Sequence, residues 1–250
     1  MFKISRIPIS SFTTLRKVFV LSLCVTWQTT YADTLGVTDG QTFDNQQLKQ
    51  FSLDVAARVQ AESHRVGVRA TLRPIFNNHV APFIETSRSF GDLDDLTPAG
   101  TVKFGGTSIG SGFYYLGLPD LYGARSILKV SYIDEENTVD TRISVGGRQA
   151  TVDYNQRSLF ATLLLSPKKP LFESGLNAYA AVGIGNQRTR RFVFADRQNI
   201  DQLAQENSTM QGYIAAGVVY PYRDMRFYAV AEFQEKASLS IGMRWNRNKR

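Results

Sequence analysis

Hydrophobic and polar residues alternate with a period of two along much of this chain. In RVGVRATLRP, residues 65–74, four apolar side chains share one side of an extended backbone, and Arg65, Arg69 and Arg73 share the other side with polar residues. A helix would gather the arginines but would point Val66 and Val68 in nearly opposite directions, so no apolar stripe would form. The segment is therefore predicted to be a β-strand with one apolar and one largely polar face.

The same alternation recurs from residue 50 almost to the end of the chain. Proline, glycine and charge clusters divide this region into ten predicted strands: 50–62, 65–75, 80–90, 101–115, 124–134, 151–165, 176–189, 209–220, 225–234 and 237–246. Short connections follow the even-numbered strands, and long polar ones follow the third, fifth and seventh. This layout predicts an all-β fold, namely a closed antiparallel up-and-down transmembrane β-barrel of about ten strands, with eight or twelve as alternatives.

Three details of this layout stay open in the sequence. Pro82 falls inside a predicted strand, which indicates a bulge or a later strand start. Residues 141–147 are strand-like, so the second long connection is either a hairpin or a source of two more strands. Residues 197–208 of the third long connection could form a short helix.

The first 32 residues differ in character from the rest. They contain four basic residues and no acidic one, a mostly apolar core from Val18 to Trp27, and Ala32 at the end, which is typical of a secretory signal peptide. We therefore expect a signal peptide at 1–32, a polar N-terminal extension at 33–49, the barrel at 50–246 and a basic tail at 247–250. No later segment approaches 18 consecutive apolar residues, which excludes transmembrane helices but leaves transmembrane strands open.

Cleavage of the signal changes the charge balance. It removes 4 of the 29 basic residues and none of the 22 acidic ones, so the formal net charge falls from +7 to +3 and no nucleic-acid partner is expected. The single cysteine, Cys24, leaves with the signal, as suits an exported protein. The acidic run at 91–96 lacks the spacing of a calcium loop, and no Cys/His set is present, so neither a metal nor a cofactor is expected.

Alternation alone does not say which face of the barrel is inside. A soluble lipocalin-like barrel would place its apolar residues inward, whereas a membrane barrel places them against lipid. Charge-free apolar faces rich in alanine, and aromatic residues near both predicted rims, favour lipid outside. The rim aromatics are Phe51, Phe76, Tyr114, Tyr115, Tyr122, Phe172, Tyr220, Tyr222, Phe227 and Trp245 at the short-turn end, and Phe90, Tyr132, Tyr154, Phe192 and Phe233 at the other.

These features resemble the small bacterial outer-membrane β-barrel proteins over residues 50–246. The last predicted strand, SLSIGMRW, is similar to the alternating C-terminal segment, ending in an aromatic residue, that the outer-membrane assembly machinery recognises in that family. This chain continues for five residues beyond Trp245, whereas family members usually stop at the aromatic. The resemblance implies export to the periplasm and insertion into the outer membrane as a monomer, with the assembly machinery, membrane lipid and lipopolysaccharide as partners.

With the apolar faces outward, the charged positions of the strands face the lumen. Arg65 is expected near the outer rim. A mixed-charge network is expected inside, because buried charges are tolerated when they are paired or hydrated. Its predicted members are Asp54, Arg58, Arg69, Arg73, Glu85, Lys129, Glu232 and Arg244, with Glu62 as a further acid. A selectivity filter for a small anionic solute is the alternative role for these charges.

The remaining candidate chemistry lies near the long connections. Arg188, Arg190 and Arg191 are placed to contact lipopolysaccharide phosphates, since arginine offers a fork of donors, although a solvated charge cluster is the alternative. His64 follows Ser63 in a predicted connection, but neighbours on a strand face opposite ways, so the two make a poor base and nucleophile. The sequence predicts a non-enzymatic outer-membrane barrel with a structural, surface-interaction or narrow-pore role. A lipid-modifying enzyme and a soluble periplasmic ligand-binding barrel are the alternatives.

Overall fold

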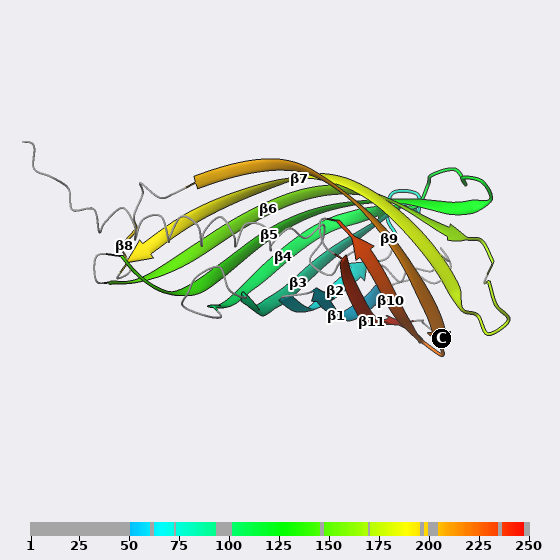
Figure 1. Ribbon diagram of the computed structural model, residues 1–250. Helices are drawn as coiled ribbons and strands as arrows, with labels where there is room; N and C mark the ends of the chain where they lie inside the picture. The colour runs from blue at the N-terminus through cyan, green and yellow to red at the C-terminus, as the bar shows by residue number, and fades with distance from the viewer. Residues whose placement is uncertain are drawn as a thin grey trace, which may run out of the picture.

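The chain forms one closed antiparallel sheet (Figure 1). The computed structural model describes residues 51–60, 63–72, 74–93, 102–145, 148–169, 171–195, 198–199, 205–234 and 237–247. No helix within these ranges has the length and apolar character needed to cross a membrane. The strands are β1 (Phe51–Gln60), β2 (Ser63–Leu72), β3 (Val80–Leu93), β4 (Val102–Tyr115), β5 (Ala124–Val145), β6 (Arg148–Pro167), β7 (Asn177–Ala195), β8 (Gln198–Asn199), β9 (Gln205–Tyr222), β10 (Met225–Phe233) and β11 (Ala237–Arg247).

Ten of these eleven strands form the wall, each paired with its neighbour in the chain. β8 has two residues and pairs with the end of β7, while β9 takes the next place in the wall beside β7. Pairing of β1 with β11, from Phe51 opposite Arg247 to Gln60 opposite Ser238, closes the sheet. The prediction of a closed up-and-down barrel of about ten strands is confirmed.

The strands are staggered as they close. The register partners of Val59 can be followed around the barrel in both directions. Through β2, β3, β4, β5 and β6 they lead to Phe192 on β7, and through β11, β10 and β9 they lead to Ala180 on the same strand. These two positions on β7 are 12 residues apart, and a stagger of this size in ten strands corresponds to a tilt of about 40° from the barrel axis.

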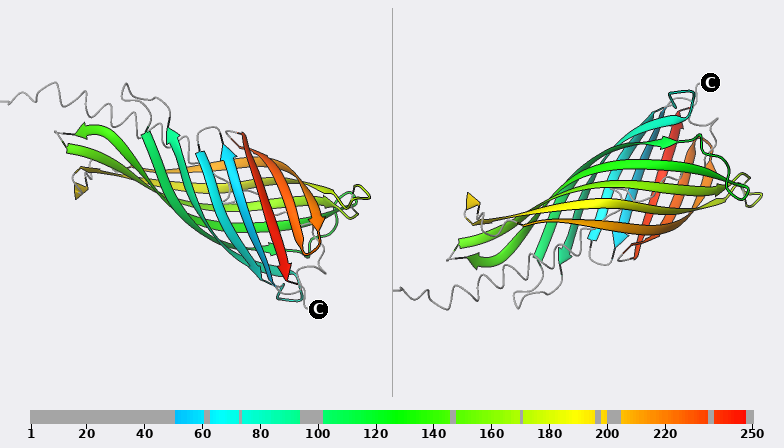
Figure 2. Two further views of the ribbon diagram at one scale, coloured as in Figure 1. Left: turned by 90° about the horizontal axis from the view of Figure 1, so that it is seen from below. Right: turned by 90° about the horizontal axis from the view of Figure 1, so that it is seen from above.

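The wall is much taller on one side than on the other. β5, β6, β7 and β9 have 22, 20, 19 and 18 residues, whereas β1, β2 and β10 have 10, 10 and 9. Figure 2 shows these long strands continuing past the ends of the short ones. About ten tilted residues suffice to cross a membrane, so the long strands extend beyond the level at which the short ones end.

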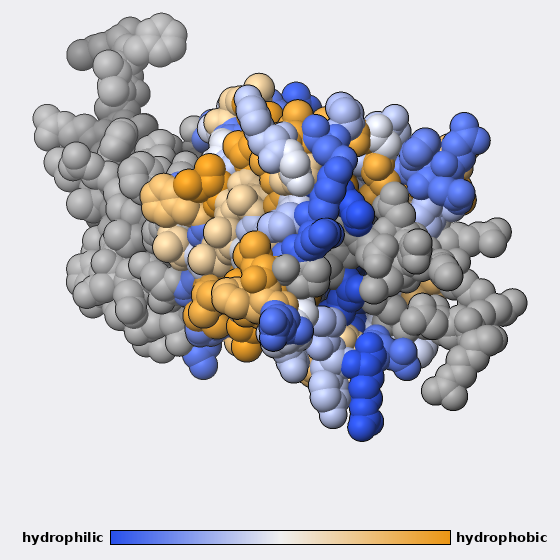
Figure 3. All heavy atoms as spheres, turned by 90° about the vertical axis from the view of Figure 1, so that its right-hand side faces the viewer, coloured by the Kyte–Doolittle hydropathy of each residue, from blue (hydrophilic) through white to orange (hydrophobic). Residues whose placement is uncertain are grey.

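The two faces of the wall differ in chemistry. Exposed aliphatic side chains recur on the outer face of nearly every strand, while the buried inner face carries serine, glutamine, tyrosine and charged residues. Figure 3 shows the apolar side chains gathered in a patch beside hydrophilic ones. A soluble barrel would show the reverse, so the structure has the inside-out polarity of a transmembrane barrel.

Several predicted strand boundaries were wrong, mostly in the long connections. The second and third long connections are largely strand, because β5 and β6 stay paired as far as Val145 opposite Arg148, with a register shift between Asp140 and Ser144. Residues 205–208 belong to β9 rather than to a helix. β3 runs through Pro82 without a register shift, since its pairing with β2 begins only at Phe83 and Pro82 pairs with β4 alone. The count is therefore ten wall strands rather than twelve.

The rim aromatics also need a correction. Most described members of the predicted girdles are partly or well exposed on the outer face, among them Phe90, Tyr132 and Trp245. Tyr114 and Tyr154 are instead buried in the lumen. Their positions in the two-residue alternation, rather than their closeness to a rim, set their direction.

Candidate functional site

Two ion pairs in the lumen join neighbouring strands. Arg244 on β11 makes a two-pronged contact with Asp54 on β1, with Nε–Oδ1 and Nη2–Oδ2 distances of 2.5 and 2.6 Å. Arg69 on β2 donates from Nε to Glu85 Oε2 on β3 at 2.6 Å, and its Nη1 reaches the Tyr114 hydroxyl at 3.2 Å. The residues of each pair are direct register partners, so strand pairing itself brings the opposite charges together.

Two further ion pairs connect strands that are not neighbours. Arg58 on β1 contacts Glu232 on β10 at 2.8 Å, past β11. Arg65 on β2 contacts Glu135 on β5 at 2.6 Å, although β3 and β4 lie between these strands in the wall. A contact between strands three places apart in a ten-stranded ring must pass through the lumen, so the Arg65–Glu135 pair crosses it.

Aromatic rings and amides add to this set. The Lys129 ammonium lies over the Phe83 ring at 5.2 Å and the Tyr114 ring at 5.9 Å from their centroids. Both distances are within the range of cation–π attraction. Glu135 also accepts from the Asn137 amide, whose oxygen accepts from Ser89, so the cross-lumen pair is held by a chain of hydrogen bonds.

The structure brings together most of the predicted lumen residues. Asp54, Arg58, Arg69, Glu85, Lys129, Glu232 and Arg244 are all buried on the inner face. Arg73 and Glu62 lie outside the described residues. Arg65, which the sequence placed near the outer rim, is 1% exposed inside the lumen.

Sequence reasoning also missed Glu135 and Arg226, both of which are buried. Glu135 lies on the same side of β5 as Lys129. The alternation is hard to recognise in the sequence because the inward position Ile133 is apolar and the outward position Asp134 is charged. Arg226 is the second residue of its strand, so few neighbours on β10 reveal its direction. Continuing the inward–outward alternation of each strand to its polar end would have identified both residues as inward-facing.

The buried charges are confined to one part of the lumen. Among the described residues, all of them lie on β1, β2, β3, β5, β10 and β11, whereas the buried side chains of β6, β7 and β9 are polar, aromatic or aliphatic and carry no charge. On these three strands, aromatic rings lie against glycines directly opposite them in register: Phe160 on Gly185, Tyr179 on Gly217 and Tyr213 on Gly183. An added Cβ at these glycines would collide with the rings, so glycine allows the aromatic side chains to lie flat against the wall.

On the outer face, Arg188 and Arg190 stand above the aliphatic positions of β7. Both are exposed, and both contact the carboxylate of Glu206 on β9, at 3.1 and 2.9 Å respectively. Arg191 belongs to β7, but its side chain lies outside the described residues. One carboxylate between two guanidinium groups leaves a net positive charge at this place.

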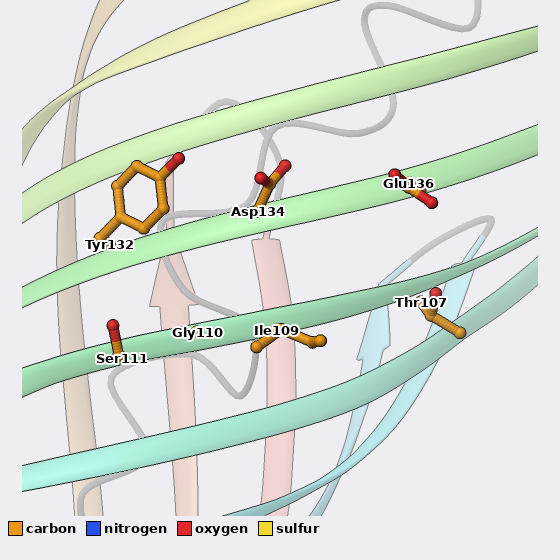
Figure 4. Close-up of a pocket in the computed structure, with 7 residues that line it drawn as sticks. All are labelled: Thr107, Ile109, Gly110, Ser111, Tyr132, Asp134 and Glu136. Carbon is orange, nitrogen blue, oxygen red and sulfur yellow. The ribbon is translucent and has the colours of Figure 1, made fainter.

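A hollow of about 400 Å³ lies between β4 and β5 on the outer wall (Figure 4). Tyr132 and Ser111 lie at one end, Asp134 and Ile109 in the middle, and Glu136 and Thr107 at the other end. The backbone of Gly110 completes the lining. We call this feature the β4–β5 hollow.

His64 and Ser63, the two residues weighed for the enzyme alternative, do not come together. His64 lies in β2 rather than in a connection, and its ring is exposed on the outer face beside Phe90, whereas Ser63 is buried on the lumen side. The two side chains therefore point to opposite faces of the wall. Within the described ranges, no group of three or more His, Cys, Asp or Glu side chains could hold a metal ion.

A closed meander, an aliphatic exterior and an ion-paired lumen define the class of this fold, which is that of the small outer-membrane β-barrels. No family model and no curated protein matches the chain. Solved structures that resemble it include the translocator domain of the autotransporter NalP from Neisseria meningitidis, at 10% identity and a TM-score of 0.48 over 78% of this chain and 86% of that one.

Two other solved structures show a similar degree of resemblance. The β domain of the Bordetella autotransporter BrkA has 13% identity and a TM-score of 0.44, covering 78% of this chain and 97% of its own. An outer membrane channel from Pseudomonas putida F1 has 9% identity and a TM-score of 0.40, covering 84% and 100%.

Proposed function

We propose that this protein is a non-enzymatic barrel of the bacterial outer membrane whose lumen is closed by ion pairs and whose long strands present a surface outside the membrane. The observation that carries the closed lumen is the Arg65–Glu135 pair, which passes through the interior between β2 and β5. A pore wide enough for solutes would leave such side chains in contact with water, yet both have side-chain exposures of 2% or less. The role that remains for the barrel is to anchor and display its outer surface.

The surface role is supported by the asymmetry of the wall. The strands β5, β6, β7 and β9 continue as paired sheet well beyond the rim formed by the short strands. Beyond the aliphatic positions their outer faces carry Asp134, Arg157, Arg188 and Glu206, all well exposed to solvent. An ordered polar sheet held outside the membrane offers a fixed surface for a partner.

Conductance in a planar bilayer tests the closed lumen. We expect the purified wild-type protein to show no steady openings, and the double variant Arg65→Ser with Glu135→Ser to open, because it removes the crossing pair without leaving one charge buried alone. The matched control is Asp134→Ser with Arg157→Ser, an exposed pair on the outer wall, which should behave as the wild type does.

Steady wild-type openings would contradict the closed lumen and favour the narrow-pore role. In that case anion preference should be measured, because the buried lumen charges among the described residues comprise six cations and four carboxylates. A preference for cations would then remove the anion-filter alternative as well.

A second proposed role is contact with lipopolysaccharide phosphates through Arg188 and Arg190, with Arg191 as a predicted third contact. This proposal is supported by the exposure of both guanidinium groups on the strand face that carries the aliphatic residues Val182 and Ile184, from which they are separated by one polar position. Phosphates of a lipid whose chains cover those residues would lie at the level of the arginines. Glu206 competes for both arginines and lowers the affinity.

Binding of purified lipid A to the full-length protein, measured by native mass spectrometry, tests this contact. We expect Arg188→Gln with Arg190→Gln to weaken binding about tenfold, the size of a loss of roughly 1.4 kcal/mol, and Glu206→Gln to strengthen it. Arg223→Gln, in the turn at the opposite rim, is the matched control. Equal losses for dephosphorylated lipid A would contradict a phosphate contact.

A further inference from the structure

The β4–β5 hollow has an unusual lining for an outer wall. Its side-chain polar atoms are all oxygens, from the hydroxyls of Thr107, Ser111 and Tyr132 and the carboxylates of Asp134 and Glu136. Such a lining accepts hydrogen bonds and favours positive charge, so it suits an ammonium group with three N–H donors. Too few carboxylates are present for a metal site of the usual kind.

Polarity changes in one direction along the β5 side of the hollow. The next outward-facing register pair toward the short turns is Phe113 with Val130, which is apolar. Ser111 with Tyr132 follows, and then Ile109 with Asp134 and Thr107 with Glu136. On β5 the outward positions thus pass from the apolar Val130 through the Tyr132 hydroxyl to two carboxylates toward the long-strand end, in the order in which a lipid passes from its acyl chain to its headgroup. On β4 the apolar Ile109 lies between Ser111 and Thr107.

One carboxylate that lines the hollow and one cation beside it form no ion pair within the described residues. Arg88 on β3 is the register partner of Thr107, which in turn is opposite Glu136 on β5. Arg88 and Glu136 are both exposed, and neither forms an ion pair within the described part of the chain. Two strand spacings, roughly 10 Å, separate the backbones of Arg88 and Glu136. Their long side chains can reduce the distance between the two charged groups to the size of a zwitterionic headgroup.

We propose that the β4–β5 hollow binds a phosphoethanolamine group carried by lipopolysaccharide. The ammonium lies among Asp134, Glu136 and the hydroxyls, the phosphate contacts Arg88, and an acyl chain runs along Phe113 and Val130. This inference rests on the proposed lipopolysaccharide contact.

Lipopolysaccharide is favoured over a phospholipid because more cations follow in register. Asp134 is opposite Arg157, with which it pairs at 3.3 Å, and Arg157 is opposite Arg188, which pairs with Glu206, so a headgroup with several phosphates would share these two exposed cations with their carboxylates.

Native mass spectrometry of the full-length protein in detergent micelles tests the inference with three probes: lipid A, lipid A substituted with phosphoethanolamine, and phosphatidylethanolamine. We expect the substituted lipid A to bind about tenfold more tightly than the plain one. The double variant Asp134→Asn with Glu136→Gln should abolish this preference. Because Asp134 also pairs with Arg157 at 3.3 Å, its loss frees that arginine, so plain lipid A is expected to bind the variant at least as tightly as it binds the wild type. Glu173→Gln, an exposed carboxylate at the opposite rim, is the matched control.

The possible outcomes separate the hypotheses. Binding of both lipid A forms without a preference, or a preference that survives the double variant, would overturn the inference and leave the arginine contact standing. Phosphatidylethanolamine binding as tightly as the substituted lipid A would overturn the choice of lipopolysaccharide. Absence of binding by any lipid A would instead contradict the proposed contact itself. Heat-modifiable gel mobility verifies that each variant is folded.

Discussion

Replacing Arg244 by alanine is expected to lower the free energy of unfolding by about 3–5 kcal/mol. Asp54 is 0% exposed and would lose its two-pronged partner, which leaves Arg69, its register partner on β2 that already pairs with Glu85, as the buried cation opposite it. Desolvation of a lone carboxylate in a medium of low polarity is the physical source of this loss. Urea unfolding of the refolded protein in lipid vesicles, followed by gel mobility, measures it.

A double variant separates the loss of a partner from the loss of packing. Asp54→Asn with Arg244→Gln removes both charges and keeps polar side chains of similar size, so most of the lost stability should return. The matched control is Arg157→Ala, since Arg157 and Asp134 form an exposed pair at 3.3 Å that should contribute less than about 1 kcal/mol. Equal effects of Arg244→Ala and Arg157→Ala would show that the lumen pair is hydrated rather than buried.

The second prediction concerns the orientation of the wall. Ile241→Arg is expected to destabilise the protein in a lipid bilayer by about 2–4 kcal/mol, the cost of an arginine near the bilayer midplane. Ile241 is 57% exposed on the outer face in the middle of β11, with Leu239 and Met243 on the same face. The same unfolding measurement in vesicles applies.

This substitution discriminates between membrane and water as the surroundings. In a soluble barrel an exposed isoleucine could become arginine with a change within about 0.5 kcal/mol, since such surface positions tolerate charge. Thr138→Arg, on the outer face of β5 beyond the aliphatic positions, is the matched control and should cost about 0–1 kcal/mol in vesicles. A small effect of Ile241→Arg would contradict the transmembrane assignment and revive the soluble periplasmic barrel.

Much of the architecture follows from the two-residue alternation. The pattern in residues 65–74 gave the correct faces of Val66, Val68 and Arg69, and turn residues placed most strand ends within a few positions. Local chemistry suffices here because an extended backbone turns successive side chains to opposite faces, whatever the rest of the chain does. The long polar ends of β5 to β9 escaped this reasoning, since outside lipid both faces can be polar and alternation no longer marks a strand.

The lumen site was partly readable from the sequence. Register partners such as Asp54 with Arg244 and Arg69 with Glu85 lie on strands that pair in any meander barrel, so alternation and strand order together predict that they share the interior. Their exact pairing depends on register, which a one-residue slip would destroy. Arg65 was misplaced because its partner, Glu135, lies 70 positions away in the chain and beyond two intervening strands.

The sequence by itself determined which side chains share a face, that the wall contains about ten strands and that charges of both signs lie on the polar face. The tertiary structure decided that the apolar face is the outer one, that Arg65 and Glu135 meet through the lumen, and that Arg88, Thr107 and Glu136 form one row on three strands. The physical reason is that alternation is a local property of the backbone. Closure, stagger and register depend on hydrogen bonds between strands that are distant in the chain.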